Sequence, residues 1–239
     1  MSLSLAGIDL VVFDKDGTLI EFDAMWAGWT VNLAANLERA AGTRIHDPLF
    51  AMLGFDPGSG HVRPGGGLAA TPMARLRERT RDLLVEAGLA VPAADRALEE
   101  AWHAPDPVAL AHPLADLTGL FDRLRRGGRR IAVATSDDRD PTERTMAALG
   151  LTNLIDALAC ADDGLPVKPA PDMVIEVCAQ LGVVPARTAV VGDSTADLEM
   201  GRRAGAGLVV GVLTGVGGIR DLEPVADRII DSVADLADD

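Results

Sequence analysis

The sequence has only two cysteines, Cys160 and Cys178, and neither belongs to a CxxC pair or a histidine cluster. This spacing argues against a zinc site and a disulfide framework, and it favours ordinary buried thiols. Long apolar runs are also missing, because no uncharged apolar stretch reaches the ~18 residues of a membrane span. No basic segment precedes an apolar stretch at the N-terminus. We therefore expect a soluble cytoplasmic protein with no membrane partner.

Positive charge is scarce as well. There are 22 Lys and Arg residues against 36 Asp and Glu residues, so the formal net charge is −14. This charge disfavours nonspecific attraction to nucleic acid or to anionic lipid. A phosphate ligand would therefore have to meet a local cluster of hydrogen-bond donors or a bound cation.

Short apolar runs and helical patterns alternate along the chain, which is long enough to bury a sizeable core. Four apolar runs break into small or polar residues: 8–13, 129–138, 187–197 and 206–217. Three helical patterns, each followed by glycine, accompany them: 116–126, 141–149 and 170–181. This alternation predicts an α/β fold, with a Rossmann-like parallel sheet covered on both faces.

The stretch 21–112 has a different character. It contains no convincing strand, and it has three amphipathic helical candidates: 24–41, 72–87 and 93–103. The segment GFDPGSGHVRPGGG, residues 54–67, is too rich in glycine and proline for a helix and is predicted to be a loop. We therefore divide the chain into a core, residues 1–20 and 113–239, and an inserted all-helical domain, residues 21–112.

Polar side chains follow the strands of the predicted core. The candidates are Asp14, Asp16, Thr135, Ser136, Lys168, Asp193 and Asp197. In a doubly wound sheet, ligands bind beyond the carboxyl ends of the strands, so these side chains are expected to meet there. Carboxylates that directly follow a buried strand need a reason, because Asp is rarely buried unless it is paired or binds a metal.

The chemistry of this residue set is specific. Three or four clustered carboxylates repel one another unless a cation neutralises them, and an oxygen-only ligand set favours Mg²⁺. One carboxylate can attack phosphorus, since aspartate forms aspartyl-phosphate intermediates. Lysine and a hydroxyl can stabilise the charge on the phosphoryl oxygens. The set therefore predicts Mg²⁺-dependent phosphoryl transfer.

Four ordered motifs resemble those of a known family. They are DKDGTL at 14–19, Thr135 after IAVA, Lys168 before PAPD, and GDSTAD at 192–197. As a set they resemble the motifs of the haloacid dehalogenase superfamily. KPAPD and the helical insertion are similar to its phosphoglycolate phosphatase and β-phosphoglucomutase branch, whose helical cap closes over a Rossmann-like core. The resemblance implies a small phosphorylated metabolite as substrate.

The resemblance also implies roles for individual residues. Asp14 would be the nucleophile, and Asp16 would protonate the leaving group and then activate water. Asp14, the backbone carbonyl of Asp16 and Asp193 would hold Mg²⁺. Asp197 would organise a water on the metal or Lys168, and Lys168 would offset the negative charge of Asp14 and phosphate.

Each assignment has a structural alternative. Thr135 and Ser136, which would bind the phosphoryl oxygens, could be helix N-caps. Lys168 taken alone could be a solvated surface charge. The DxDG pattern also suits tight turns and calcium loops, although Leu19 stands where a calcium loop needs further ligands. Asp197 could merely stabilise a helix N-terminus.

Three other functions compete with a phosphatase. A haloacid dehalogenase uses the same nucleophile on carbon, but it needs no acid at the position of Asp16. A phosphosugar mutase shares nearly all of these residues, but it tends to carry an acidic residue where this chain has Gly192. A binding module that has lost catalysis would lack catalytic residues that are present here. We therefore expect a phosphoric monoester hydrolase.

Specificity depends on the inserted domain, because the core motifs contact only the phosphate. Arg63 is the only Lys or Arg in the loop 54–67, and a guanidinium group suits a carboxylate. We predict that Arg63 contacts the non-reacting end of the substrate when the cap closes. Trp26 and Trp29, three residues apart on a helix, are predicted to pack within the cap or between cap and core.

Overall fold

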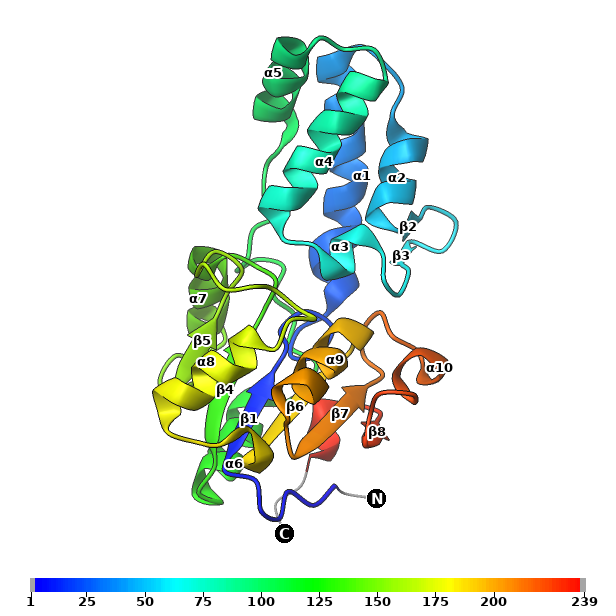
Figure 1. Ribbon diagram of the computed structural model, residues 1–239. Helices are drawn as coiled ribbons and strands as arrows, with labels where there is room; N and C mark the ends of the chain where they lie inside the picture. Colours follow the sequence, from blue (N-terminus) through cyan, green and yellow to red (C-terminus); the bar gives the residue numbers. More distant parts are fainter. Residues whose placement is uncertain (1–2, 237–239) are drawn as a thin grey trace.

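A computed structural model describes residues 3–236, and it has two parts (Figure 1). One part is a parallel sheet with helices on both faces. The other is a group of helices that stands over the carboxyl ends of the strands. The chain enters this helical part directly after the first strand and leaves it before helix α6.

Within residues 3–236 the main sheet has six parallel strands in the order β5-β4-β1-β6-β7-β8. The strands are β1 Leu10–Phe13, β4 Arg130–Ala134, β5 Ala157–Ala159, β6 Thr188–Gly192, β7 Leu208–Val212 and β8 Arg228–Ile230. The chain runs outward from β1 through β4 to β5 and then crosses back to β6. The strand order therefore reverses beside β1, and a ligand crevice is expected at that place.

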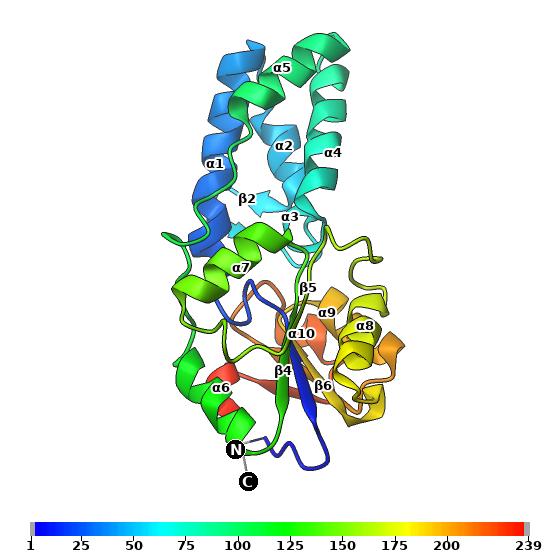
Figure 2. The same ribbon diagram turned by 90° about the vertical axis from the view of Figure 1, so that its left-hand side faces the viewer.

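Helices cover both faces of the sheet (Figure 2). On one face lie α6 Leu117–Arg126 and α7 Arg139–Ala148, and on the other lie α8 Asp172–Leu181 and α9 Thr195–Ala204. Side chains alternate along β1, so Phe13 packs with Phe121 of α6, whereas Val12 packs with Val174 of α8. A short helix, α10 Ile219–Leu222, and the 3₁₀ turns η1 Pro185–Arg187 and η2 Val233–Asp235 complete this part.

The helical part has a buried core of its own, separate from the clusters that surround the sheet. Its helices are α1 Phe22–Ala41, α2 His46–Leu53, α3 Gly67–Ala70, α4 Met73–Glu86 and α5 Val91–Ala101. Trp26 and Trp29 are buried, with ring centroids 5.6 Å apart in a T-shaped contact, as the packing prediction requires. The indole N–H of Trp29 donates to the carbonyl oxygen of His103 at 2.7 Å.

The α/β fold with a parallel core sheet is confirmed, and the four apolar runs contain β1, β4, β6 and β7. The expectation of a plain loop at 54–67 is wrong, because this segment contains a small antiparallel hairpin. Its strands are β2 Phe55–Asp56 and β3 His61–Val62, paired Phe55 to Val62 and Asp56 to His61. Strands of two residues are too short to show an alternating pattern, so the sequence gives no signal for them.

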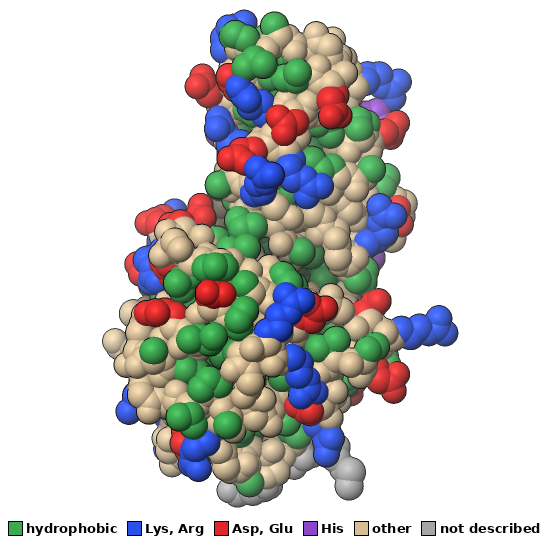
Figure 3. Space-filling view, in the orientation of Figure 1, with side chains coloured by type: hydrophobic (Ala, Val, Ile, Leu, Met, Phe, Trp, Pro, Cys, Tyr) green, Lys and Arg blue, Asp and Glu red, His purple; other side chains and the backbone are tan. Residues whose placement is uncertain are grey.

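The surface agrees with the acidic composition. On the face shown in Figure 3, Lys and Arg side chains are scattered over both parts, with Asp and Glu side chains among them. This face therefore presents no continuous basic patch of the kind that binds nucleic acid. Residues 3–236 include no helical segment with the length and hydrophobicity of a bilayer span.

Candidate active site

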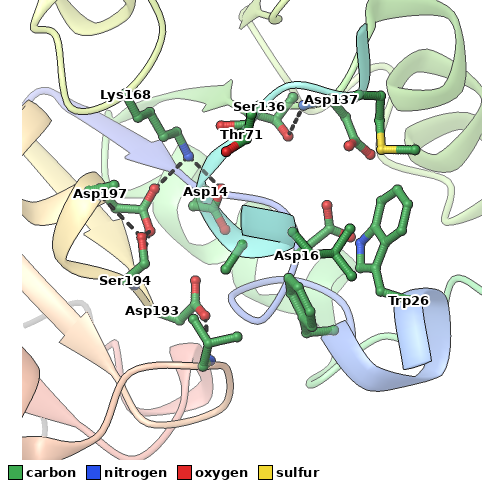
Figure 4. A pocket seen from close by; sticks show the side chains of 17 residues that line it. Asp14, Asp16, Trp26, Thr71, Ser136, Asp137, Lys168, Asp193, Ser194 and Asp197 are labelled. Atoms are coloured by element: carbon green, nitrogen blue, oxygen red, sulfur yellow. Dashed lines mark hydrogen bonds and ion pairs between the residues drawn. The ribbon is translucent and has the colours of Figure 1, made fainter. Parts of the chain in front are cut away.

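A cavity of about 30 Å³ lies between the carboxyl ends of the central strands and the helical part. Seven predicted site residues line it: Asp14, Asp16, Thr135, Ser136, Lys168, Asp193 and Asp197. They come from the ends of β1, β4 and β6, from the start of α9 and from the loop before α8. Figure 4 shows their side chains converging on one space.

Lys168 connects two of the carboxylates. Its Nζ atom forms an ion pair with Asp14 and lies 2.6 Å from Oδ1 of Asp197. All three side chains are buried. Burial acts to lower the pKa of Lys168, but the charges of Asp14 and Asp197 outweigh this effect and raise it. Lys168 is therefore a buried, doubly paired side chain and not a solvated surface charge.

Asp193 completes a buried cluster of three carboxylates. One oxygen each from Asp14, Asp193 and Asp197 lies within 4.8 Å of the others. Oδ2 of Asp193 accepts a hydrogen bond from the backbone N–H of Val216 at 2.7 Å. Gly17, with φ +85°, leaves the space that this carboxylate occupies, since a Cβ atom there would lie 2.5 Å from Oδ2 of Asp193.

The electrostatics of the cluster fit a bound divalent cation. Burial raises the pKa of Asp14 to about 7, against the opposing charge of Lys168. Burial and the nearby charge of Asp14 raise the pKa of Asp193 well above its usual value. Three carboxylates share one lysine here, so a divalent cation would stabilise their ionised forms. Carboxylate oxygens are also the ligands that hard cations prefer.

Both carboxylate oxygens of Asp197 have hydrogen-bond or ion-pair partners. Its Oδ2 atom accepts hydrogen bonds from the backbone N–H of Ser194 at 3.0 Å and from its hydroxyl group at 2.5 Å. The backbone N–H of Asp197 donates in return to the hydroxyl oxygen of Ser194 at 3.3 Å, which completes a capping box at the start of α9. The other oxygen pairs with Lys168. Asp197 therefore both caps the helix and holds the lysine beside Asp14.

Asp16 lies on the other side of the cavity, with partners of its own. Nζ of Lys15 is 2.7 Å from Oδ2 of Asp16 and 2.9 Å from Oδ2 of Asp137. The indole N–H of Trp26 in α1 also points toward Asp16 (Figure 4), and it acts to lower the pKa of this carboxyl group. Lys15 and Asp137 are functional-site residues that were not predicted from the sequence. A signal for Lys15 existed, because a lysine between two aspartates at the end of a buried strand needs paired charges.

Thr135 and Ser136 follow β4 and line the cavity. The backbone N–H of Thr135 donates to the carbonyl oxygen of Ala159 at 2.9 Å, and its hydroxyl accepts from the N–H of Asp137 at 3.2 Å. The N-cap residue of α7 is Asp138. Neither Thr135 nor Ser136 is therefore the cap of this helix, which removes the structural alternative for this pair.

Arg63 is the predicted site residue that the structure does not bring to the cavity. It is exposed and lies outside the cavity lining. Its backbone N–H donates to the carbonyl oxygen of Gly54, and its carbonyl oxygen accepts from the N–H of Gly66, both at 2.9 Å. These bonds close the base of the hairpin against α2, and the side chain of Arg63 lies at the surface of the helical part.

Other residues of the helical part line the cavity instead: Phe22, Trp26, Leu68, Ala69, Thr71 and Met73. Most of this wall was not predicted from the sequence. Its members come from the start of α1 and from the segment between α3 and α4, where apolar residues carry no pattern that distinguishes a cavity wall from a core.

Comparison with known proteins gives a consistent result. Residues 8–205 match the family described as haloacid dehalogenase-like hydrolase. The phosphoglycolate phosphatase of Aquifex aeolicus strain VF5 is 24% identical over 196 residues, which cover 82% of this chain and 81% of that protein. The next two curated relatives match over about two fifths of their own length, at 43% and 42%.

Solved structures show the same fold. A predicted phosphoglycolate phosphatase from Haemophilus somnus 129PT superposes with a TM-score of 0.66 at 20% identity, covering 96% of both chains. A HAD phosphatase from Thermococcus onnurineus superposes with a TM-score of 0.65 at 20% identity, covering 95% of both chains. With the family match over residues 8–205, these findings show that the chain belongs to the haloacid dehalogenase-like hydrolases.

Proposed function

We propose that the chain is a Mg²⁺-dependent phosphatase that hydrolyses a small phosphorylated metabolite through an aspartyl-phosphate intermediate on Asp14. The observation that carries the proposal is the buried cluster in which Asp14 meets Lys168 and lies beside Asp193. A relative of similar length that carries the name phosphoglycolate phosphatase supports it.

The reaction takes place in two displacements. A carboxylate oxygen of Asp14 attacks phosphorus, and the bond from phosphorus to the leaving oxygen breaks while Asp16 donates a proton to that oxygen. Asp16 then takes a proton from water, and this water attacks phosphorus and releases Asp14 with inorganic phosphate. Lys168 and Thr135 stabilise the phosphoryl oxygens, where charge gathers in both transition states.

The metal site uses groups already at the strand ends. Asp14, Asp193 and the backbone carbonyl of Asp16 would hold Mg²⁺, and Asp197 would position Lys168. When bound, Mg²⁺ supplies positive charge beside the phosphoryl oxygens. The three carboxylates and single lysine provide a net negative site, which fits this cation.

Two features favour a hydrolase over the competing functions. Asp16 lines the cavity and forms an ion pair with Lys15, with the indole of Trp26 facing it, as expected of a functional general acid. Gly192 has no room for a side chain, because a Cβ atom there would lie 2.3 Å from Cβ of Asp197. The acidic residue that mutase-like enzymes tend to carry at this place would therefore displace Asp197.

Residues 21–112 form a cap over the core in this proposal. The backbone N–H of Glu21 donates to the carbonyl oxygen of His112 at 2.9 Å, and Ile20 pairs with Pro113. The chain thus leaves and re-enters the core at one place. A cap with its own buried core and a single two-stranded connection can move as a unit to admit substrate.

Removing the metal is expected to abolish activity. Purified protein should release p-nitrophenol from p-nitrophenyl phosphate with Mg²⁺, lose this activity in EDTA, and regain it when excess Mg²⁺ is added, because the carboxylate cluster repels the phosphate without a cation. The assay follows p-nitrophenol absorbance. Hydrolysis that resists chelation would contradict the proposal and would favour a metal-independent reaction such as dehalogenation.

Mg²⁺ affinity should depend on Asp193 more than on Asp197. Asp193→Asn removes a proposed direct ligand, whereas Asp197 acts through Lys168 and Ser194 and should cost only about 10–100-fold. Titration of the initial rate with Mg²⁺ gives the comparison, with Asp106→Asn, on the distant segment after α5, as the matched control. Equal losses for Asp193→Asn and Asp197→Asn would contradict the distinction between ligand and positioning residue.

A further inference from the structure

We infer that the leaving group of the substrate is uncharged, and that the site discriminates against phosphate esters that carry a second anionic group. This inference rests on the proposed phosphatase function and adds the substrate class. It follows from the wall that the helical part contributes, from the pairing of the cations near the cavity, and from the charge of the space outside it.

The wall that faces the catalytic carboxylates is neutral. Phe22, Trp26 and Leu68 are buried and apolar, and Met73 lies beside them at the start of α4. The indole N–H of Trp26 points toward the carboxyl group of Asp16 (Figure 4) and not into free space along the wall. The hydroxyl group of Thr71 is therefore the polar side-chain group that this wall offers to a substrate.

Lys168 in the cavity lining and Lys15 beside Asp16 are both paired with carboxylates. Among the described residues that line it, Lys168 is the only Lys or Arg, and it is held between Asp14 and Asp197. Lys15, beside Asp16, is held by Asp16 and Asp137. A phosphoryl group would take the remaining positive charge at Lys168, so a second anionic group on the substrate would find no cation there.

The space outside the neutral wall is acidic. A wider hollow of about 550 Å³ shares Phe22 and Val216 with the cavity, and Glu21 and Asp23 line it. His61 also lines this hollow, with Nδ1 2.5 Å from a carboxylate oxygen of Asp23. Within the described residues, no Lys or Arg lines it. An anionic tail that extended this way would therefore approach two carboxylates.

These observations set the cost of a charged leaving group. A carboxylate placed against the neutral wall would lose its hydration without gaining a partner, and a polar group left in this way costs binding energy. The acidic hollow adds repulsion, which is the usual means of rejecting a wrong ligand. Phosphoglycolate has such a carboxylate next to the reacting group, so this chain should use it poorly. This conclusion replaces the expectation that Arg63 binds an anionic end.

A pair of esters of equal size tests the inference. Phosphoglycolate and its amide, glycolamide phosphate, differ only in the charge of the leaving group. Each ester is added as a competitor of p-nitrophenyl phosphate in the presence of Mg²⁺, and its inhibition constant is measured from the release of p-nitrophenol. This ranks the apparent affinities of both esters even if one of them is not hydrolysed. The amide should compete better, by about 10–100-fold, because it loses no charge solvation against the wall.

Variants of the wall sharpen the test. Met73→Lys adds a cation beside Thr71 and should reduce the difference between the inhibition constants of the two esters, which is the gap between them. Met73→Gln, of similar length but neutral, should leave this difference unchanged. Arg63→Ala should leave the gap unchanged. Equal or better competition by phosphoglycolate, or a loss of its binding alone in Arg63→Ala, would overturn the inference. No Mg²⁺-dependent hydrolysis of p-nitrophenyl phosphate would overturn the proposed function, and the inference with it.

Discussion

Replacing Asp14 with asparagine is expected to abolish turnover, with a loss of roughly 10⁴–10⁶-fold, as for the removal of other catalytic nucleophiles. An amide keeps the volume of the carboxylate but cannot form the aspartyl phosphate. Asp14 also forms one of the two ion pairs of Lys168, so the change removes both the nucleophile and one partner of the lysine. The measurement is the initial rate on p-nitrophenyl phosphate at saturating Mg²⁺.

Two further variants make this result interpretable. Asp16→Asn should slow proton transfer by ~10²–10⁴-fold while leaving phosphorylation of Asp14 possible with a good leaving group. Asp9→Asn, at the other end of β1, disturbs only the exposed pair with Arg187 and should retain full activity. A near-native rate for Asp14→Asn would exclude the covalent mechanism.

Replacing Lys15 with methionine is expected to destabilise the protein by about 3 kcal/mol, because it leaves two carboxylates without the buried cation that they share. The side chain of Lys15 is 1% exposed, whereas those of Asp16 and Asp137 are 12% and 15% exposed. The carboxylates can therefore recover some hydration, which places the effect at the lower end of the range for a broken buried pair. Urea unfolding followed by circular dichroism measures it.

The double variant Lys15→Met with Asp137→Asn separates charge from packing. The second change removes one of the two unpaired carboxylates, so the double variant should regain part of the lost stability if unpaired charge is the cause. Arg187→Met breaks an exposed ion pair with Asp9 and should change the unfolding midpoint little. An unchanged midpoint for Lys15→Met would show that the buried bridge is not part of what holds Asp16.

The core of the fold could be predicted because its signals are local. β1, β4 and β6 each combine a short apolar run with a polar motif at the carboxyl end, and a parallel sheet brings such ends together. β5 and β8 are only three residues long and were not predicted. Short strands at the sides of a sheet depend on pairing with neighbours, and the sequence does not encode that pairing locally.

The candidate site divides in the same way. Asp14, Lys168 and Asp193 are separated along the chain, yet motifs identify each of them, and the structure places them in one cluster. The neutral wall carries no motif, because Leu68 and Met73 resemble any core residue until the helical part is seated on the core. Arg63 lies in a segment without periodicity, so the sequence could not predict whether its side chain points toward the cavity or toward solvent.

The covalent intermediate on Asp14 can be trapped and its position identified. The Asp16→Asn variant is mixed with p-nitrophenyl phosphate and Mg²⁺, quenched in acid within the first turnover and treated with borohydride, which reduces an acyl phosphate to an alcohol. Peptide mass spectrometry then locates the modified residue. We expect conversion of the aspartate at position 14 to homoserine. Modification of Asp193 or Asp197 instead, or release of p-nitrophenol with no modification at position 14, would contradict it.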